Sequence, residues 1–570
     1  MNGLDWWILI VTIGLIVWYG IYKSRRSNDI RSYWLADRQL PWYHVGLSVM
    51  ATQASAITFL AAPGQAYGDG LRFVQFYFGL PLAMIVLCAF FLPIYRNLNV
   101  YTAYEYLEKR FDSKTRTLTA TLFLLQRGLS TGITIYAPSI VLSTILHLDI
   151  RVTTIFTGLI VTLYTVSGGT KAVSYTQLLQ MAVIFSGLFI AGWMVVHLLP
   201  HKVNFIDALS IAGKMGKLNA IDWKFDLNNR YNVWSGIIGG FFLQLSYFGT
   251  DQSQVGRYLT GKSTKQSRIG LVMNGMVKIP MQFMILLIGT LVFTFYQFQT
   301  PPLYFNHVEV DRIANASDKA LYQSFENDYY ANHTVKRGHV LELTDAIQHN
   351  DQQEIDRLRP IVQSDDQRGK EIRANAITII QRNNPNADAN DTNYVFLYFV
   401  THNLPHGIIG LLITIVLLAA MGSTASGLNS LGSSTSVDFY RRFWGDDQSE
   451  NQFISTSRWI TAAWGIFCTV IAIYAGKIGN LIEAVNILGS LFYGTILGIF
   501  LTAFFLKKVT GKSVFVAAII TEIMVYIGWK NDWLAFLWLN AFGALTVMAL
   551  SWLFQITMKS TLNHQRTSVT

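Results

Sequence analysis

Cysteine is nearly absent from this chain of 570 residues, which contains only Cys88 and Cys468. Each lies inside an apolar run, so neither a disulfide framework nor a CxxC metal site can be built from them. Charged residues are also scarce at 14% of the chain, compared with about 25% in a typical soluble domain. The scarcity indicates that most side chains face lipid or one another instead of water.

Sequence patterns typical of several other protein classes are missing as well. No HExxH motif occurs among the scattered histidines. The letters GRYLTGKS at 256–263 fit the P-loop pattern, but they follow an apolar span and not a buried strand, so we interpret them as a chance match. The net charge of +10 is spread over short loops between apolar segments, which is typical of membrane topology and not of nucleic-acid binding. We therefore predict no enzyme activity, no organic cofactor and no nucleic-acid partner.

Long apolar segments dominate the remainder of the sequence. A bilayer core about 30 Å thick needs about 20 apolar residues per helix. The segments that approach this length are 4–22, 42–66, 73–95, 117–146, 152–168, 173–199, 233–255, 269–299, 403–428, 457–475, 480–506, 513–529 and 533–557. They predict an all-α polytopic membrane protein with about thirteen transmembrane helices, which resides in a cell membrane (inner or plasma).

The distribution of basic residues predicts the orientation. The loops after odd-numbered spans carry most of the lysine and arginine, for example Lys109, Arg110, Lys507 and Lys508. Cytoplasmic loops are enriched in these residues, so we expect the N-terminus outside and the C-terminus in the cytoplasm. The loop 200–232 disagrees, because it places five basic residues on the presumed outer side.

One long polar segment, residues 301–395, interrupts the apolar pattern. It divides the chain into a transmembrane region at 1–300, an extracytoplasmic insertion at 301–395 and a second transmembrane region at 396–570. Apolar residues recur at helical spacing over 340–347 and 351–362. We interpret the segment either as a lid or partner-binding cap, or as a solvated insertion without a role of its own.

Small and polar residues gather in the middle of the second apolar span. The stretch Ser48–Gly64 contains Thr52, Gln53, Ser55 and Thr58, and it ends on a Pro-Gly pair. Polar side chains in a membrane span face protein or water, and a broken helix leaves backbone carbonyls free to bind ions. The alternative is a continuous helix whose small residues let a neighbour approach closely.

A second such cluster lies at Ala419–Ser430. Ala419, Gly422 and Ser423 are spaced i, i+3 and i+4, and therefore lie on one helix face. Ala51 and Ala54 share a face in the same way. Carbonyl oxygens of the three alanines and the Ser423 hydroxyl would suit a small hard cation. Close packing of two small-residue helices explains the same spacing. The spacing does not decide between a cation site and close packing.

Several motifs in order give the chain its resemblance to the sodium/solute symporter family. They are SYWLADRQLPWYHVGLSVMATQASAITF (32–59), YTAYEYLEKRF (101–111), TVSGGTKAVSYTQLLQ (165–180) and STASGLNS (423–430), with VDFY after it. The segments GITIYAPSIVL (132–142) and SYFGTDQSQVGRYLTGKSTKQS (246–267) resemble most the multivitamin, monocarboxylate and iodide branch. The resemblance covers nearly the whole chain except 301–395.

This resemblance implies a LeuT-like, five-plus-five inverted repeat whose first helices, 42–66 and 233–255, are both broken. It implies a main sodium site at Ala51, Ala54, Ala419, Gly422 and Ser423, with sodium as the coupling ion. Because Gly422 replaces a residue that usually carries a hydroxyl, we expect weaker sodium binding. A second family site uses an aspartate and serines. Here Gln177 and Ala425 take two of those positions and Ser426 is retained, so we expect no second site and one sodium per solute.

Candidate solute-binding residues are the polar side chains within otherwise apolar spans. We expect the solute to contact Gln53, Thr58, Arg127, Gln244, Tyr247 and Lys278. Arg127 either attracts a carboxylate on the solute or forms an internal ion pair, for example with Asp251 or Glu105. Lys278 matches a family position near a sugar site, but the sugar-binding residues around it are not preserved.

Together these observations predict a monomeric, sodium-coupled symporter that imports a small organic solute by alternating access, and a solute that carries a carboxylate is one candidate. Two other classes stay open at this point. One is a transporter-like sensor or receptor. The other is a proton-coupled or weakly coupled carrier, including a uniporter or a channel-like protein.

Overall fold

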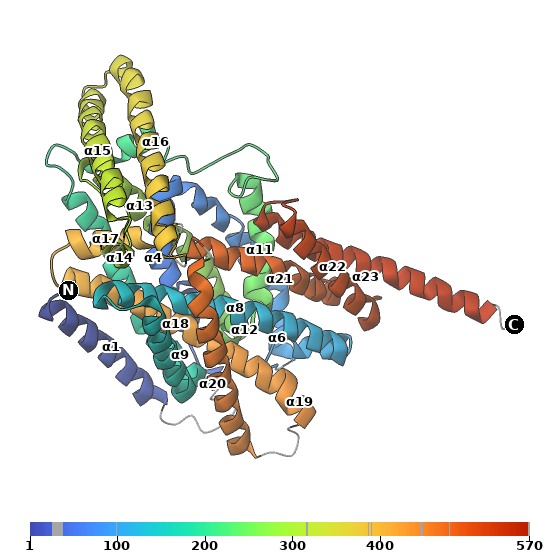
Figure 1. Cartoon of the computed structure of the whole chain (residues 1–570). Helices are drawn as coiled ribbons and strands as arrows, with labels where there is room; N and C mark the ends of the chain where they lie inside the picture. Colours follow the sequence, from blue (N-terminus) through green and yellow to red (C-terminus); the bar gives the residue numbers. More distant parts are fainter. Residues whose placement is uncertain are drawn as a thin grey trace.

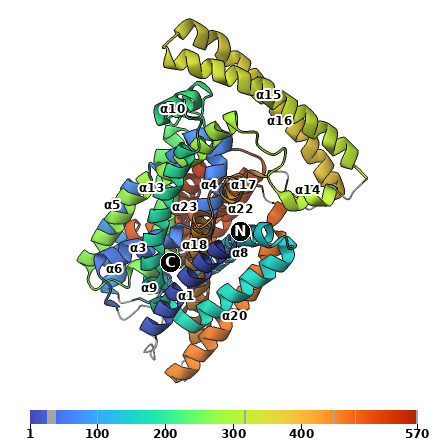
Figure 2. The same ribbon diagram turned by 90° about the vertical axis from the view of Figure 1, so that its left-hand side faces the viewer.

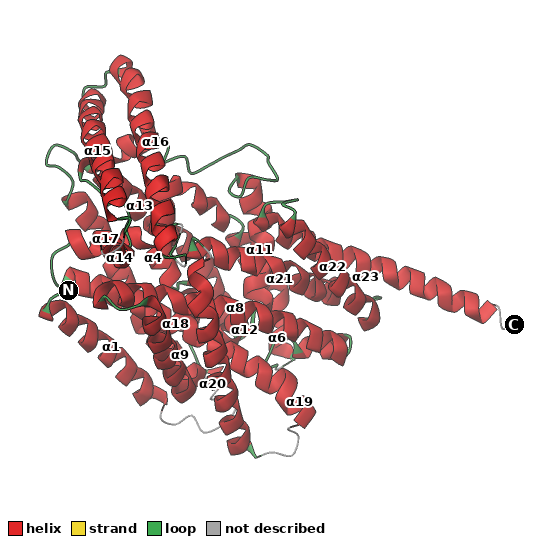
Figure 3. Ribbon diagram, viewed as in Figure 1, coloured by secondary structure: helices red, strands yellow, loops and turns green. Residues whose placement is uncertain are grey.

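The computed structural model describes residues 1–24, 38–98, 100–314, 317–385, 387–388, 390–444, 449–477 and 479–567. Side chains at 21, 23–24, 167–172, 477 and 558–567 lie outside this description, as do residues 32–37 of the first motif. Within the described ranges the chain forms helices and no strand (Figure 3). An isolated backbone bridge pairs Leu40 with Gly261. The predicted all-α fold class is therefore confirmed.

The helices form a bundle from which two long helices project (Figure 1). In chain order they are α1 (Gly3–Ser24), α3 (Trp42–Gln53), α4 (Ala56–Asp69), η2 (Gly70–Tyr77), α5 (Leu80–Val86), η3 (Leu87–Phe91), α6 (Leu92–Asn97), α7 (Glu105–Arg110), α8 (Ser113–Leu146), α9 (Ile150–His197), α10 (Phe205–Lys214), η4 (Ser235–Gly239), α11 (Gly240–Thr250), α12 (Gln252–Tyr258), α13 (Thr264–Phe298), α14 (His307–Ile313), α15 (Lys319–Gln348), α16 (Gln352–Asn383), α17 (Thr392–Asn403), α18 (Ile408–Ser434), η5 (Thr435–Tyr440), α19 (Arg441–Trp444), α20 (Glu450–Tyr474), η6 (Ala475–Lys477), α21 (Leu481–Phe505), α22 (Gly511–Lys530) and α23 (Phe536–Thr567).

Ten helical stretches among the described residues are long and apolar enough to cross a membrane, so the predicted number of thirteen is not confirmed. Part of the difference lies in α9, a continuous helix that contains both predicted spans 152–168 and 173–199. Another part lies in the two broken helices. Neither α3 nor α11 reaches the 18 residues of a full span, because each stops where its chain segment breaks.

The first break lies between α3 and α4. Ala54 has φ −81° and ψ 81°, and Ser55 is extended with φ −87° and ψ 174°. The Ser55 N–H donates to the Gln53 carbonyl (3.1 Å) and the Thr58 N–H donates to the Ser55 carbonyl (2.9 Å). In an unbroken helix these two amides would bond to Ala51 and Ala54. The break therefore leaves the carbonyls of Ala51 and Ala54 without their helical partners.

This break occurs nine residues before the Pro-Gly pair that suggested it. Pro63 lies inside α4, which continues to Asp69. Gly64 instead permits a close approach, since a Cβ at this position would lie 1.9 Å from the Thr392 carbonyl oxygen at the start of α17. Pro63 packs in turn against Gly289 of α13. Pro63 and Gly64 therefore allow α4 to pack closely against α13 and α17.

The second break lies between α11 and α12, within the segment 233–255 where a broken helix was predicted. The backbone of Asp251 is extended between them, with φ −78° and ψ 120°. One carboxylate oxygen of Asp251 accepts the Ser253 N–H (2.8 Å) and so caps α12. The break thus places a carboxylate at a helix N-terminus in the interior of the bundle, where the local dipole favours negative charge.

The polar segment 301–395 forms an antiparallel pair of helices, α15 and α16, that projects from the bundle (Figures 1 and 2). Its apolar residues at helical spacing, such as Val340, Leu343, Leu358 and Val362, are buried. At the tip of the pair, the Gln348 side-chain amide donates to the Lys202 carbonyl (2.6 Å) and to Asp207 of α10 (2.9 Å). The segment is therefore ordered and rests on the loop between α9 and η4.

Candidate functional site

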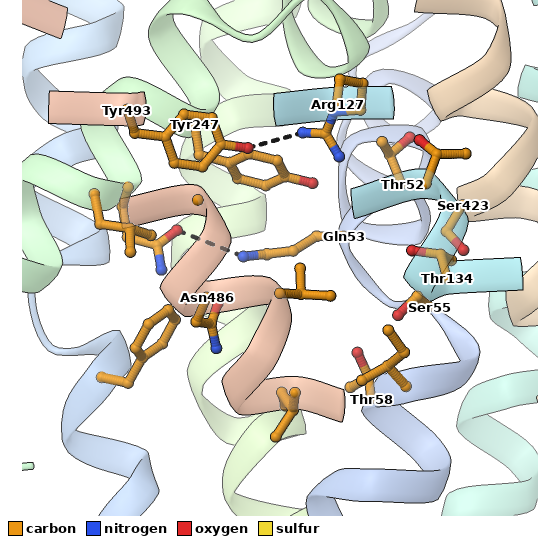
Figure 4. A pocket seen from close by; sticks show the side chains of 18 of the residues that line it. Thr52, Gln53, Ser55, Thr58, Arg127, Thr134, Tyr247, Ser423, Asn486 and Tyr493 are labelled. Carbon is orange, nitrogen blue, oxygen red and sulfur yellow. Dashed lines mark hydrogen bonds between the residues drawn. The ribbon is translucent and has the colours of Figure 1, made fainter. Parts of the chain in front are cut away.

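A cavity of about 110 Å³ lies in the interior of the bundle, where the two broken helices meet (Figure 4). Its walls come from the α3–α4 break, η2, α8, α11, α18 and α21. Five of the six predicted solute-binding residues line it, together with the predicted sodium ligand Ser423. The five are Gln53, Thr58, Arg127, Gln244 and Tyr247.

Two glutamine side chains connect the broken helices across this cavity. The Gln53 side-chain nitrogen, at the end of α3, lies 3.5 Å from the Gln244 side-chain oxygen on α11 (Figure 4). Within the described part of the chain, the Gln53 oxygen Oε1 and the Gln244 nitrogen Nε2 have no hydrogen-bond partner. A buried amide without partners carries a desolvation cost of about 1–3 kcal/mol. The cavity therefore offers one acceptor and one donor to a bound polar molecule.

Arg127 of α8 forms the internal ion pair that we considered as one of two alternatives. Its guanidinium contacts the carboxylate of Asp251, and the same nitrogen donates to the Tyr493 hydroxyl (2.9 Å). Tyr493 donates in turn to Asp251 (2.9 Å). Glu105, the other partner considered, instead accepts the backbone N–H of Tyr101 (2.8 Å). The positive charge at the cavity wall is thus balanced within the protein.

Lys278, the sixth predicted solute-binding residue, does not line this cavity. It is fully buried on α13, and its ammonium has no hydrogen-bond partner in the described ranges. Gly270 of α13 packs against Gly46 of α3, and Gly289 packs against Pro63 of α4, so α13 runs beside both halves of the broken helix. This parallel packing places Lys278 at about the level of the break, outside the cavity walls.

The oxygen atoms of the predicted sodium site come from both helices. The released carbonyls of Ala51 and Ala54 are buried, and Ser423 of α18 lines the same cavity as Gln53 at the break. The Ser423 hydroxyl donates to the Ala419 carbonyl (2.9 Å), and α18 continues unbroken through both residues. One side of the site is therefore an opened helix end, and the other is an intact helix that presents a hydroxyl.

Gly422 has a packing reason to lack a side chain. A Cβ at this position would lie 2.5 Å from the side-chain oxygen of Gln180 on α9. Neither polar atom of the Gln180 side chain has a hydrogen-bond partner among the residues that the structure describes. A serine at 422 would require Gln180 to move, so the glycine that we expect to weaken sodium binding also makes room for this glutamine.

Gln177, one turn before Gln180, occupies the position where the family's second site would need a carboxylate. Its nitrogen lies within hydrogen-bond distance of the Thr52 hydroxyl (3.2 Å), the Gly422 carbonyl (3.2 Å) and the Ser426 hydroxyl (3.0 Å). Its oxygen accepts from the Ser48 hydroxyl (2.6 Å). A neutral amide thus connects α9 with α3 and α18 at a fully buried point.

The structure adds wall residues that the sequence did not indicate. They are Asn486 and Tyr493 on α21, and Thr131 and Thr134 on α8. Asn486 is a single polar residue within an apolar span, and the hydroxyl residues of α8 resemble those of any packed membrane helix. The i, i+3 spacing of Thr131 and Thr134 was the one sequence pattern that pointed to these wall residues. This spacing alone does not indicate a binding site.

Comparisons with known proteins agree with this architecture. A family model described as the sodium:solute symporter family matches residues 33–310 and 373–521. A solved structure of a sodium-coupled sialic acid symporter, in a substrate-bound outward-open state, aligns with a TM-score of 0.74 at 21% identity and covers 98% of both chains. This similarity shows the fold, a five-plus-five inverted repeat of the LeuT type.

Curated relatives with similar sequences are transporters and not enzymes. The human sodium/iodide cotransporter is 33% identical over 270 residues, which are 47% of this chain and 41% of that protein. The sodium/glucose cotransporter of Vibrio parahaemolyticus is 24% identical over 536 residues, 91% of this chain and 84% of that protein. The chain spans less than half the length of the first of these relatives. Since the family model matches well over half of the chain, the chain belongs to the sodium:solute symporter family.

Proposed function

We propose that this protein is a sodium-coupled symporter that imports a small organic solute by alternating access. The observation that carries the proposal is the break at Ala54–Ser55, which frees two buried carbonyls next to a polar cavity that Ser423 also lines. Membrane carriers bind ions at such broken helices. The named relatives, which include sodium-coupled iodide, monocarboxylate and glucose transporters, support the same activity.

Sodium would act as an additional bond between α3 and α18. Carbonyl oxygens of Ala51, Ala54 and Ala419 and the hydroxyl of Ser423 would hold it, and Gly422 would contribute no side-chain oxygen. A bound ion shifts a conformational equilibrium only by the difference between its affinities for the two states. Sodium would therefore favour the state in which α3 and α18 are close together, and its release into a low-sodium interior would reverse this effect.

The cavity favours a solute with neutral hydrogen-bonding groups. The unpartnered Gln53 oxygen and Gln244 nitrogen would accept and donate one hydrogen bond each, and the Thr58 hydroxyl lies on the same wall. Arg127 would recognise a solute carboxylate only by sharing its guanidinium with Asp251. A carboxylate-bearing solute is our second candidate, and the unpartnered Nε of Arg127 favours it. Lys278 would act on the solute indirectly, through the packing of α13 against the break.

Stoichiometry and topology complete the proposal. The amide of Gln177 carries no charge, so we propose one sodium per solute. We also propose a monomeric transport unit in a cell membrane, with the N-terminus outside, residues 301–395 on the extracytoplasmic side between the two transmembrane regions, and the C-terminus in the cytoplasm.

Uptake by proteoliposomes tests the proposal. Purified protein would be reconstituted and offered a panel of radiolabelled solutes, with an inward sodium gradient, with equal sodium on both sides, or with a proton gradient alone. A symporter concentrates its solute only in the first condition. Binding without accumulation would indicate a sensor, equilibration without accumulation would indicate a uniporter or channel, and accumulation in the third condition alone would indicate proton coupling.

A further inference from the structure

A second cavity, of about 270 Å³, lies between the projecting hairpin and the bundle. The hairpin helices α15 and α16 form one side, and the C-terminal ends of α4 and α13 form the other. Most of the hairpin falls in residues 311–372, which the family model does not match. Part of the lining of this cavity therefore lies outside the residues that the family model matches, and the cavity is separate from the central cavity described above.

Two lysines of this cavity contact a single carboxylate, and a third lysine lines the same cavity. Lys336 of α15 and Lys370 of α16 both contact Asp366, at 2.7 Å and 3.0 Å from its two oxygens. The ammonium of Lys217 lies over the ring of Phe293 (4.5 Å) and donates to the carbonyls of Tyr67 (2.9 Å) and Gly68. Among the described residues, Lys217 has no carboxylate partner. This group of four, Lys217, Lys336, Lys370 and Asp366, is the lysine cluster.

The other charged side chains of the cavity are already matched. Arg373 contacts both oxygens of Asp391 (2.6 and 2.8 Å), and Asp365 accepts a hydrogen bond from His339 (2.7 Å). Counted over the whole lining, four cationic side chains face three carboxylates. The excess positive charge therefore lies in the lysine cluster, and two of its ammonium groups, on Lys217 and Lys336, belong to residues only 8% exposed.

The electrostatics of the cluster agree with this count. Burial is the main reason that the pKa of the Lys217 ammonium falls to about 8. The carboxylates of Asp366 and Asp69 act to raise this pKa, and the ammonium groups of Lys370 and Lys336 act to lower it. Burial opposes ionisation of Asp366, yet Lys336 and Lys370 hold its pKa at about 2. Asp366 is therefore ionised at any physiological pH. Ammonium groups that are buried together repel one another, and an additional anion would relieve this repulsion.

We propose that this cavity binds a small organic anion through its carboxylate, with the lysine cluster as the recognition site. Gly369 has no side chain where α16 faces α15, which leaves room beside Asn332. The ligand would lie at one end of α4. Tyr67 of α4 lines this cavity and Thr58 lines the central one, and the nine residues between them span about 14 Å of helix.

Isothermal titration calorimetry on the purified full chain in detergent tests this site. The probes are acetate, succinate and phosphate, titrated without sodium against a background of constant chloride. Succinate should bind, and acetate should bind more weakly, because two carboxylates can engage two ammonium groups. Lys217→Gln and Lys370→Gln should each weaken succinate binding about tenfold, the effect of losing one hydrogen bond to a charged group. Lys319→Gln, which removes an exposed lysine from the start of α15, should change nothing.

Asp366→Asn provides an opposite test, since it removes the carboxylate that competes with the ligand. This substitution should strengthen succinate binding several-fold. If Asp366 had a purely structural role, the substitution would not strengthen succinate binding. Absence of succinate binding, an equal loss in Lys319→Gln, or stronger binding of phosphate than of either carboxylate would each overturn the proposal. Far-ultraviolet circular dichroism would confirm that the variants are folded. Because the titration uses no sodium gradient, its failure would leave the proposed symport unaffected.

Discussion

The side-chain nitrogen of Gln177 lies 3.0 Å from the hydroxyl oxygen of Ser426, and the same nitrogen reaches Thr52 and the Gly422 carbonyl at 3.2 Å. An amide nitrogen carries only two hydrogens, so three oxygen atoms share them. Three converging oxygens at a fully buried point resemble a cation site, but here a neutral group of the protein occupies it. The geometry thus gives a physical reason for our expectation that only one sodium ion is coupled.

Replacing Gln177 by Asp should create a second cation site. The shorter side chain would withdraw the amide and supply a carboxylate, while Thr52, Ser426 and the Gly422 carbonyl retain their oxygens. We expect hyperbolic sodium dependence of uptake in the parent protein, with a Hill coefficient near one, and a value clearly above one in Gln177→Asp. Gln177→Leu, which has neither oxygen nor charge, is the control and should remain hyperbolic. A Hill coefficient near two in the parent would contradict this interpretation.

Arg127 and Asp251 should depend on each other for stability. Asp251 is buried and the Arg127 side chain is only 12% exposed, so removal of one leaves a charge without its partner, at a cost of up to about 3–5 kcal/mol. We therefore expect Arg127→Gln and Asp251→Asn each to lower the thermal unfolding temperature in detergent, and the double variant to recover most of the loss. An additive loss in the double variant would show that the two side chains act separately.

Polar residues indicated a break in the span 42–66 but left a continuous helix possible, and the break in 233–255 followed only from the family resemblance. The position of the first break was misjudged. Pro63 lies inside α4, and the extended backbone occurs instead at Ala54 and Ser55.

Other features depend on long-range contacts that no local pattern carries. Arg127 was compatible with an internal partner or with a solute, and only the fold showed that Asp251 reaches it. The isolated Asn486 gave no signal within its apolar span. Likewise, the approach of Lys217 to the hairpin brings together residues that are more than a hundred positions apart.

The two glutamines of the central cavity should determine solute affinity without affecting sodium. Gln53→Ala and Gln244→Ala each remove a group that we expect to bond to the solute, so the KM for solute should rise about tenfold, the effect of one lost hydrogen bond that leaves its partner unpaired. The sodium concentration for half-maximal uptake should change little. Gln126→Ala is the matched control, because Gln126 is buried on α8 and bonds to Ser130 outside the cavity wall. Equal effects of all three variants would count against the assignment.

Lys217 should make stability depend on pH. Its pKa is about 8 in the folded protein, below the ordinary lysine value of 10.5. Below pH 8 the lysine is charged in both states, and the cost of burying the charge is fully present. Between pH 8 and 10.5 the unfolded chain binds more protons, so this residue's contribution to stability rises with pH, by up to about 3 kcal/mol.

Thermal unfolding from pH 7 to pH 10 checks the sign. The difference in unfolding temperature, parent minus Lys217→Gln, should become more positive as the pH rises through 8. Lys319→Gln serves as the control for the loss of one exposed lysine, and its difference from the parent should stay constant. A Lys217→Gln difference that does not vary with pH would show that Lys217 is not held in a lowered-pKa environment.

The sodium dependence of uptake in Ser423→Ala tests most directly whether the opened end of α3 and the hydroxyl of α18 share an ion. Ser430→Ala is the matched control, since Ser430 lies two turns further along α18, is buried, and also donates to a carbonyl of its own helix. We expect Ser423→Ala to raise the sodium concentration for half-maximal uptake about tenfold, through the loss of a ligand to a charged group, and Ser430→Ala to leave it unchanged. An unaltered sodium dependence in Ser423→Ala would contradict the account.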